Sequence, residues 1–313
     1  MSETKRRQRG VAKVWEATPR PGRGPHLRAA PVLEPGRWRE FDPFLLMMED
    51  WFQSGTFDFH PHRGIETVTF VIEGRLKHED NQGGYGILEP GDVQWMTAGG
   101  GILHSEDPLP GETVHSLQLW VNLPRADKMS TPRYQDLKAG DMPLRTEPGA
   151  TVRIFSGTSG GIAAPTRNVV PITFVELSLE AGASVAQELP ADYNGFVYVL
   201  SGSGAFGAAE TRGTAGQVLW LESLVSPWRS ASAAAENAGK DGASGEDGAG
   251  EETAASEVTV RADEPLRALL VAGRPIGEPV VAQGPFVMNT AGEIKQAFDD
   301  FYAGKFGARP NPR

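Results

Sequence analysis

The sequence predicts an all-β protein of two antiparallel β-barrels in tandem, followed by a C-terminal α-helix. Short apolar runs alternate with turn residues along most of the chain, which holds 38 glycines and 24 prolines in 313 residues. This length allows about two domains of roughly 150 residues each. The strand-and-turn pattern of the first half also recurs in the second half. Together these observations favour two barrels of the same design.

The first barrel is expected to begin after a polar segment rich in proline and glycine. A strand is predicted at Asp42–Met48, and an unbroken strand-and-turn pattern runs from about residue 51 to 135. Its apolar runs, which are separated by glycine and proline, are Glu66–Glu73, Tyr85–Leu88, Val93–Met96 and Thr113–Leu123. Such punctuation is typical of antiparallel barrels, which bring sequence-distant strands side by side.

The second barrel follows a proline-containing connector at residues 124–150. Its strands are predicted at Ile172–Leu179, Phe196–Leu200, Val218–Leu221 and Leu266–Val271. Residues 230–257 contain no aromatic or large aliphatic side chain and cannot repay the entropy of ordering, so they are interpreted as a flexible surface insertion. The expected domains are therefore residues 1–135, residues 136–288 and a terminal helix and tail at 289–313.

The C-terminal helix is predicted from a start signal and a periodic stripe. Thr290 and Glu293 have the spacing of a capping box. An apolar stripe at helical period follows, and Gly304 is a plausible stop. The expected role of this helix is to pack on a barrel.

A weak internal repeat supports the two-barrel interpretation. Phe70–Gly74 resembles Tyr198–Gly202, and Pro90–Val93 resembles Ala215–Val218. Aligning the repeats places Pro190 opposite His62, and no histidine occurs after His115. The second barrel therefore cannot rebuild a histidine-rich site, and it is predicted to be structural.

Composition excludes several classes of function. The formal net charge of −10 argues against direct nucleic-acid binding. The basic run at residues 5–9 is interpreted as a solvated tail. Because the chain has no cysteine, disulfides, zinc–thiolate sites and iron–sulfur clusters are excluded. The sequence shows neither a membrane span nor an apolar signal-peptide region, so a cytoplasmic protein is expected.

Two pairs of residues have the arrangement that a metal site requires. His60 and His62 form one pair, and His104 and Glu106 form the other. In a strand, residues i and i+2 point to the same face, so two such pairs on neighbouring strands could converge on one ion. Glu66 competes with Glu106 as the carboxylate ligand, because strict alternation would place it on the face of His60 and His62. Alternatively, Glu66 would orient the imidazole of a metal ligand. His78 and His26 belong to no motif.

These residues lie in motifs that resemble the pirins, a family of two-domain proteins within the cupin superfamily. The matching stretches are DPFLL at 42–46, HPHRGIE at 60–66, GDVQWMTAG at 91–99, GILHSE at 101–106, LQLWVNL at 117–123 and GPFVMNT at 284–290. The resemblance implies two cupin-type (jelly-roll) barrels, of which only the first holds a single metal ion, usually iron. Carried over position by position, the metal ligands would be His60, His62, His104 and Glu106.

The ligand set suggests which metal is bound. Four protein ligands on an octahedral ion leave two positions open, as a site for an oxygenated substrate and dioxygen needs. Zinc would instead be closed in a tetrahedral structural site. Fe(II) is therefore the first expectation, with Mn, Co, Ni or Zn as alternatives.

The resemblance implies an enzyme of the quercetin 2,3-dioxygenase type. Its substrates would be a flavonol and O2, and Glu106 would be the catalytic base. The alternative is a regulatory protein that senses metal or redox state and binds a metabolic enzyme or transcription factor without turnover. In either case we expect a monomer without direct contact to nucleic acid or membrane.

Overall fold

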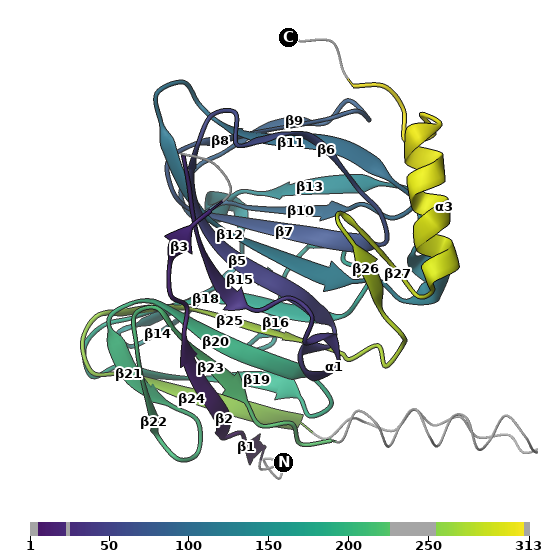
Figure 1. Ribbon diagram of the computed structural model, residues 1–313. Coiled ribbons are helices and arrows are strands. Elements are labelled where there is room, and N and C mark those ends of the chain that lie inside the picture. The colour runs from purple at the N-terminus through teal and green to yellow at the C-terminus, as the bar shows by residue number, and fades with distance from the viewer. Residues whose placement is uncertain (1–5, 23–25, 226–254, 310–313) are drawn as a thin grey trace, which may run out of the picture.

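The computed structural model describes residues 6–22, 26–225 and 255–309 and confirms the all-β fold of two barrels with a C-terminal helix (Figure 1). Each barrel combines a seven-stranded sheet with a smaller one. The large sheet of the first barrel has, in spatial order, β13 (Arg133–Leu137), β10 (Val93–Thr97), β7 (Ile65–Glu73), β12 (Thr113–Asn122), β5 (Phe44–Gln53), β4 (Leu27–Leu33) and β3 (Arg20–Pro21). Its small sheet has β6 (Phe57–His62), β11 (Ile102–Pro108), β8 (Leu76–Asp80) and β9 (Tyr85–Leu88).

The second barrel repeats this plan. Its large sheet has, in spatial order, β14 (Leu144–Glu147), β15 (Ala150–Ser156), β18 (Ile172–Leu179), β25 (Leu266–Gly273), β20 (Asn194–Ser201), β23 (Gln217–Leu221) and β2 (Val11–Glu16). The small sheet contains β1 (Arg7–Gln8), β24 (Ala255–Ala262), β21 (Ser203–Phe206), β22 (Thr211–Thr214) and β19 (Ser184–Pro190). The first repeated segment lies at the ends of β7 and β20, and the second leads into their neighbours β10 and β23, so both occupy equivalent places in the two large sheets. The sequence repeat therefore reflects a repeat of topology.

Several segments differ from the sequence interpretation. The segment 124–150, expected to be a connector, contains two strands, and each extends a large sheet: β13 pairs with β10, and β14 pairs with β15. Most of the predicted insertion at 230–257 lies outside the described residues, but residues 255–257 begin β24. There the Ser256 hydroxyl is buried and donates to the Leu189 carbonyl at 2.8 Å, which fixes it in the sheet.

Residues 7–16 belong to the second barrel rather than to a solvated tail. β2 pairs antiparallel with β23, and β1 pairs parallel with β24. Arg9, the last residue of the basic run, is fully buried and donates to the Tyr193 carbonyl at 2.6 Å. A buried guanidinium requires such acceptors, which only distant segments of the chain supply here. The predicted domain boundaries stay a prediction, and this pairing favours counting residues 7–16 with the second barrel.

The two large sheets pack against each other through aromatic side chains. Phe70 of the first barrel lies 5.9 Å from Phe155 of the second, and Phe44 lies 5.7 Å from Phe196, between ring centroids. The interior of the second barrel is filled by aliphatic side chains such as Val175, which is fully buried. By contrast, the interior of the first barrel carries buried polar side chains, and these form the candidate site.

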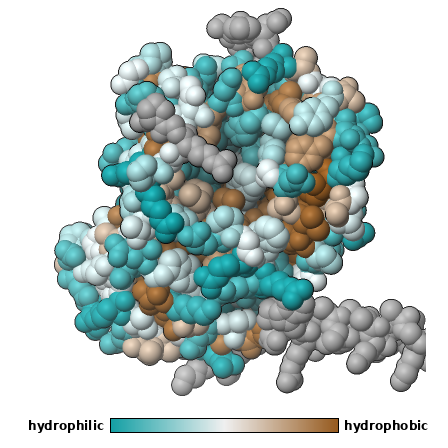
Figure 2. Space-filling model, in the orientation of Figure 1, coloured by the Kyte–Doolittle hydropathy of each residue, from teal (hydrophilic) through white to brown (hydrophobic). Residues whose placement is uncertain are grey.

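The C-terminal region covers the first barrel. α3 (Ala291–Tyr302) begins with the predicted capping box of Thr290 and Glu293 and packs with the hairpin of β26 (Val281–Gln283) and β27 (Phe286–Met288). Figure 1 shows α3 beside the first barrel, and in Figure 2 hydrophobic surface gathers over the same hairpin. The remaining elements are short: α1 (Trp38–Phe41), the 3-10 helices Arg125–Asp127 and Ala139–Asp141, and the pair β16 (Thr158–Ser159) and β17 (Ile162–Ala163). Among the described residues, no helix is long and apolar enough to cross a membrane.

Candidate metal centre

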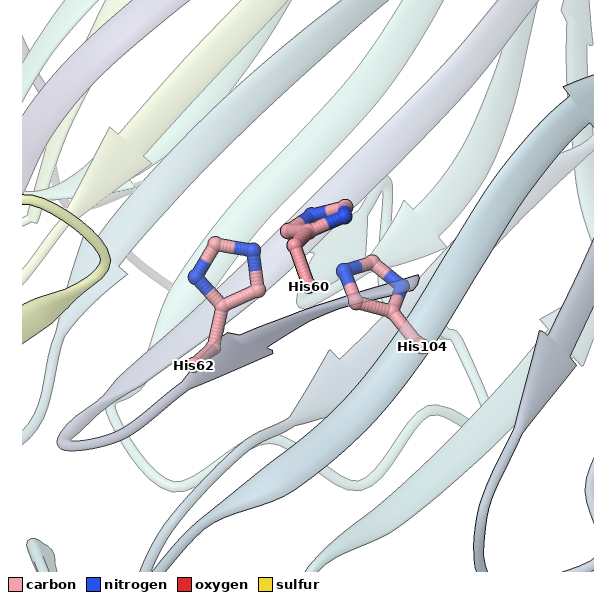
Figure 3. A group of neighbouring side chains, drawn as sticks. All are labelled: His60, His62 and His104. Carbon is pink, nitrogen blue, oxygen red and sulfur yellow. The ribbon is translucent and has the colours of Figure 1, made fainter. Parts of the chain in front are cut away.

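Three histidines converge inside the first barrel (Figure 3). His60 and His62 lie on β6, and His104 lies opposite His60 on the neighbouring β11. One ring nitrogen from each residue lies within 4.8 Å of those from the other two, which is close enough for a shared metal ion. The i, i+2 spacing on β6 therefore places both imidazoles on the inner face, as the sequence predicted.

The local sequence allows this arrangement because β6 is an edge strand. Pro61 separates the two histidines and lies opposite Leu103. Proline cannot donate a ladder hydrogen bond and is tolerated at a sheet edge, which is where the strand order places β6. The motif thus combines two inward imidazoles with an outward residue that suits the edge.

The imidazoles of His62 and His104 are chemically suited to bind a metal. Their side chains are buried, and neither ring nitrogen of either residue has a hydrogen-bond partner among the described residues. Burial and the neighbouring His60 lower the pKa of both rings well below the usual value of 6.5. The backbone of Pro285 lies near the His62 ring and opposes this effect, without reaching hydrogen-bond geometry. Neutral imidazoles with free lone pairs fit a metal, which would compensate for their burial.

His60 differs because one of its nitrogens is already engaged. Its Nδ1 lies 2.8 Å from the Asp58 carbonyl, an arrangement in which Nδ1 carries the proton. This hydrogen bond leaves Nε2 as the free lone pair and orients the ring, as is common for metal-binding histidines.

Glu106 lies two residues beyond His104 on the same strand but outside the group of three histidines. Its Oε1 accepts from the Thr69 hydroxyl at 2.7 Å, and its Oε2 accepts from the Gln118 amide at 2.6 Å. The β6–β11 pairing shifts register between His104 and Glu106. The structure therefore places Glu106 beside the cluster with both oxygens held by neighbouring strands.

Glu66 is not the competing ligand that strict alternation suggested. β6 ends at His62, and the chain turns at Gly64 (φ +80°) before β7 begins at Ile65, so the alternation is broken. A Cβ on Gly64 would lie 1.9 Å from the Val287 carbonyl oxygen, so the turn requires glycine. The Glu66 carboxylate instead accepts from the Thr97 hydroxyl at 2.7 Å and lies 3.4 Å from the Val169 amide of the second barrel. It therefore orients no ligand imidazole.

The turn after His62 is fixed by two buried cations. Arg63 donates to the Gly100 carbonyl at 2.7 Å and to Asp300 of α3 at 2.9 Å. Lys128 donates to the carbonyls of Gly64 and Val287, each at 2.9 Å. The helix and hairpin thereby hold the end of the histidine strand in place.

Several residues at the site could not be recognised from the sequence. The Trp120 ring lies 5.0 Å from that of His62, and the His78 ring lies 5.4 Å from that of His104, between centroids. His78 Nε2 lies 3.3 Å from Asp80. Burial, and then the charges of Glu106 and Glu49, raise the pKa of Asp50 to about 7. His78 and Asp80 do have the i, i+2 spacing of a strand pair, and this spacing was the one signal in the sequence that could have found them.

Comparison with known proteins agrees with the fold and the site. The pirin family matches residues 34–121, and the pirin C-terminal cupin domain matches residues 249–307. Pirin-1 of Arabidopsis thaliana is 38% identical over 85% of this chain and 84% of that protein. A solved structure from Geobacillus kaustophilus is 51% identical, with a TM-score of 0.77 over 88% of this chain and 100% of that one.

A second solved structure is of an enzyme. A quercetin 2,3-dioxygenase from Acinetobacter baumannii is 29% identical to this chain, with a TM-score of 0.77 over 96% of this chain and 99% of that one. The two family matches, the 38% identity to Pirin-1 and the paired cupin barrels together show that this chain belongs to the pirin family.

Proposed function

We propose that the chain is a metal-dependent dioxygenase of the quercetin 2,3-dioxygenase type. The observation that carries this proposal is the buried cluster of His60, His62 and His104, whose free ring nitrogens are suited to one divalent ion. The likeness to the Acinetobacter baumannii enzyme supports the reaction class. The overall reaction takes up one O2 per flavonol, opens the central ring and releases carbon monoxide.

His60, His62, His104 and Glu106 would hold the metal, with Fe(II) as the first candidate and Mn, Co, Ni or Zn as alternatives. When bound, such an ion supplies Lewis acidity toward the flavonol oxygens and one-electron chemistry toward O2. Three neutral imidazoles and one carboxylate are suitable ligands for an open Fe(II) site. They are less suitable for a metal that prefers thiolate ligands.

Glu106 would accept the proton of the flavonol 3-hydroxyl. The Thr69 hydroxyl and the Gln118 amide donate to its two oxygens, and these two hydrogen bonds fix the orientation of the carboxylate. Asp50, whose pKa is about 7, is a nearby group that can hold a proton at neutral pH. The ring centroids of Trp120 and His62 lie 5.0 Å apart, and these rings would help to exclude water from the site.

The test is metal content and oxygen uptake on quercetin for the Fe(II)-reconstituted protein. We expect stoichiometric iron and flavonol loss in the wild type, and loss of both in His62→Ala. His26→Ala is the matched control, because His26 is exposed and lies outside the cluster. Bound iron without oxygen uptake would overturn the dioxygenase proposal in favour of the regulatory alternative. Absence of stoichiometric metal in the wild type would overturn the site itself.

A further inference from the structure

A second feature with binding chemistry lies on the outer face of the small sheet of the first barrel. A groove of about 580 Å³ is lined by residues of β8 and β11 and of the loop before β6. On β8, Glu79 lies between the inward residues His78 and Asp80, and its register partner Ser105 lies between His104 and Glu106 on β11. The groove and the histidine cluster are thus on opposite faces of one sheet.

The groove carries an excess of negative charge. Its lining includes the carboxylates of Asp58, Glu79 and Asp107 against the two cations Lys77 and Arg309. Asp107 accepts from the Ser54 hydroxyl at 2.8 Å and the Gly55 amide at 2.8 Å, so its charge is already partly compensated. Glu79 has no such donors.

Glu79 is the unusual residue of the groove. Its side chain is only 7% exposed, and its Oε1 is shielded from solvent without any hydrogen-bond donor among the described residues. An ionised carboxylate in this position lacks the compensation that buried charges normally have. A cation bound in the groove would supply it.

The chain itself shows what kind of cation the groove accommodates. The Arg309 guanidinium lies 3.5 Å from the Asp58 carboxylate and 5.9 Å from the centre of the Phe59 ring, and it donates to the Phe59 carbonyl at 3.2 Å. It therefore lies at the Asp58 side of the groove and has no contact with Glu79. A planar guanidinium fits such a mixture of carboxylates and aromatic surface better than an ammonium ion does.

We propose that this groove binds an arginine side chain of a partner protein, with its guanidinium against Glu79. The partner segment would be basic and extended, and Arg309 would compete with it for the Asp58 side of the groove. This assignment does not depend on the dioxygenase proposal, because it uses only the outer face of the sheet.

The test is an NMR-detected titration of the full chain with an acetylated, amidated peptide that contains two arginines separated by glycine, at 0.15 M salt. We expect the Kd to rise about tenfold in Glu79→Gln, since the substitution removes a charge-assisted hydrogen bond to the guanidinium. In Arg309→Gln the Kd should fall, because the internal competitor is removed. Glu264→Gln, which removes one exposed charge on the second barrel, should leave the Kd unchanged.

Matched peptides with citrulline or lysine in place of arginine define the outcomes further. Citrulline should abolish binding, and lysine should weaken it. The proposal would be overturned if the Kd were equal in the wild type and Glu79→Gln. It would also be overturned if Glu79→Gln and Glu264→Gln raised the Kd equally, because general charge attraction would then explain the binding. Equal binding of the lysine peptide would overturn the assignment to guanidinium.

Discussion

At the scale of single residues, Asp50 is a carboxylate at the site whose negative charge is strongly opposed by its surroundings. Its pKa is about 7 in the folded protein against 3.8 for an ordinary aspartate. Between these two values the folded state binds more protons than the unfolded state, so this group makes the free energy of unfolding fall as pH rises from about 4 to 7.

We therefore expect metal-free Asp50→Asn to be more stable than the wild type at pH 8, by up to about 4 kcal/mol, and the gain to shrink toward pH 4. Urea unfolding at several pH values measures both effects. Asp299→Asn is the control, because that side chain is 53% exposed on α3. The prediction would be contradicted if the free energy of unfolding changed with pH in the same way in the wild type and in Asp50→Asn.

At the scale of elements, the hairpin β26–β27 and α3 act as a packed cover on the first barrel. Phe286 is fully buried, and its ring lies 4.8 Å from that of Phe298 and 5.6 Å from that of Phe306. We expect Phe286→Ala to lower the free energy of unfolding by about 3–5 kcal/mol, since it removes a buried ring and leaves a cavity.

The free energy of unfolding of Tyr302→Ala provides the comparison, because Tyr302 is 79% exposed at the end of α3. We expect a change within about 0.5 kcal/mol for this surface substitution. Equal losses in the two variants would show that the cover is not packed as described.

Elements also show how far the sequence could predict the site. His60 and His62 share a face because both lie within β6, and the capping box of α3 is equally local, so sequence spacing was sufficient for both. The same argument from spacing was wrong for Glu66, because the turn at Gly64 moves the chain into a different sheet. The proximity of His78 to His104 depends on the pairing of β8 with β11, which no local pattern encodes.

At the scale of the whole molecule, Arg9 ties the start of the chain to the second barrel. It donates to Ser256 at 2.8 Å and to the carbonyl of Tyr193 at 2.6 Å, and burial lowers its pKa to about 10. Composition suggested a solvated tail because a basic run carries no information about distant acceptors.

We expect Arg9→Met to lower the free energy of unfolding by about 2–3 kcal/mol, because buried acceptors lose their donor. Arg6→Met should change it by less than about 0.5 kcal/mol, since Arg6 is 49% exposed and lies 3.8 Å from Glu257. Thermal or urea unfolding distinguishes the two. A loss in Arg6→Met as large as that in Arg9→Met would show that charge, rather than burial, is responsible.

The exchange of chain ends between the barrels has a consequence for synthesis on the ribosome. β2 emerges early, whereas its partner β23 follows about 200 residues later. The first barrel likewise receives its cover, β26, β27 and α3, only from the last part of the chain. Neither barrel can therefore be completed before strands from far along the chain have been made, and such long-range pairing favours slow folding. The nascent chain must keep the edge of β2 unpaired for most of its elongation, and an unpaired strand edge is open to pairing with other chains.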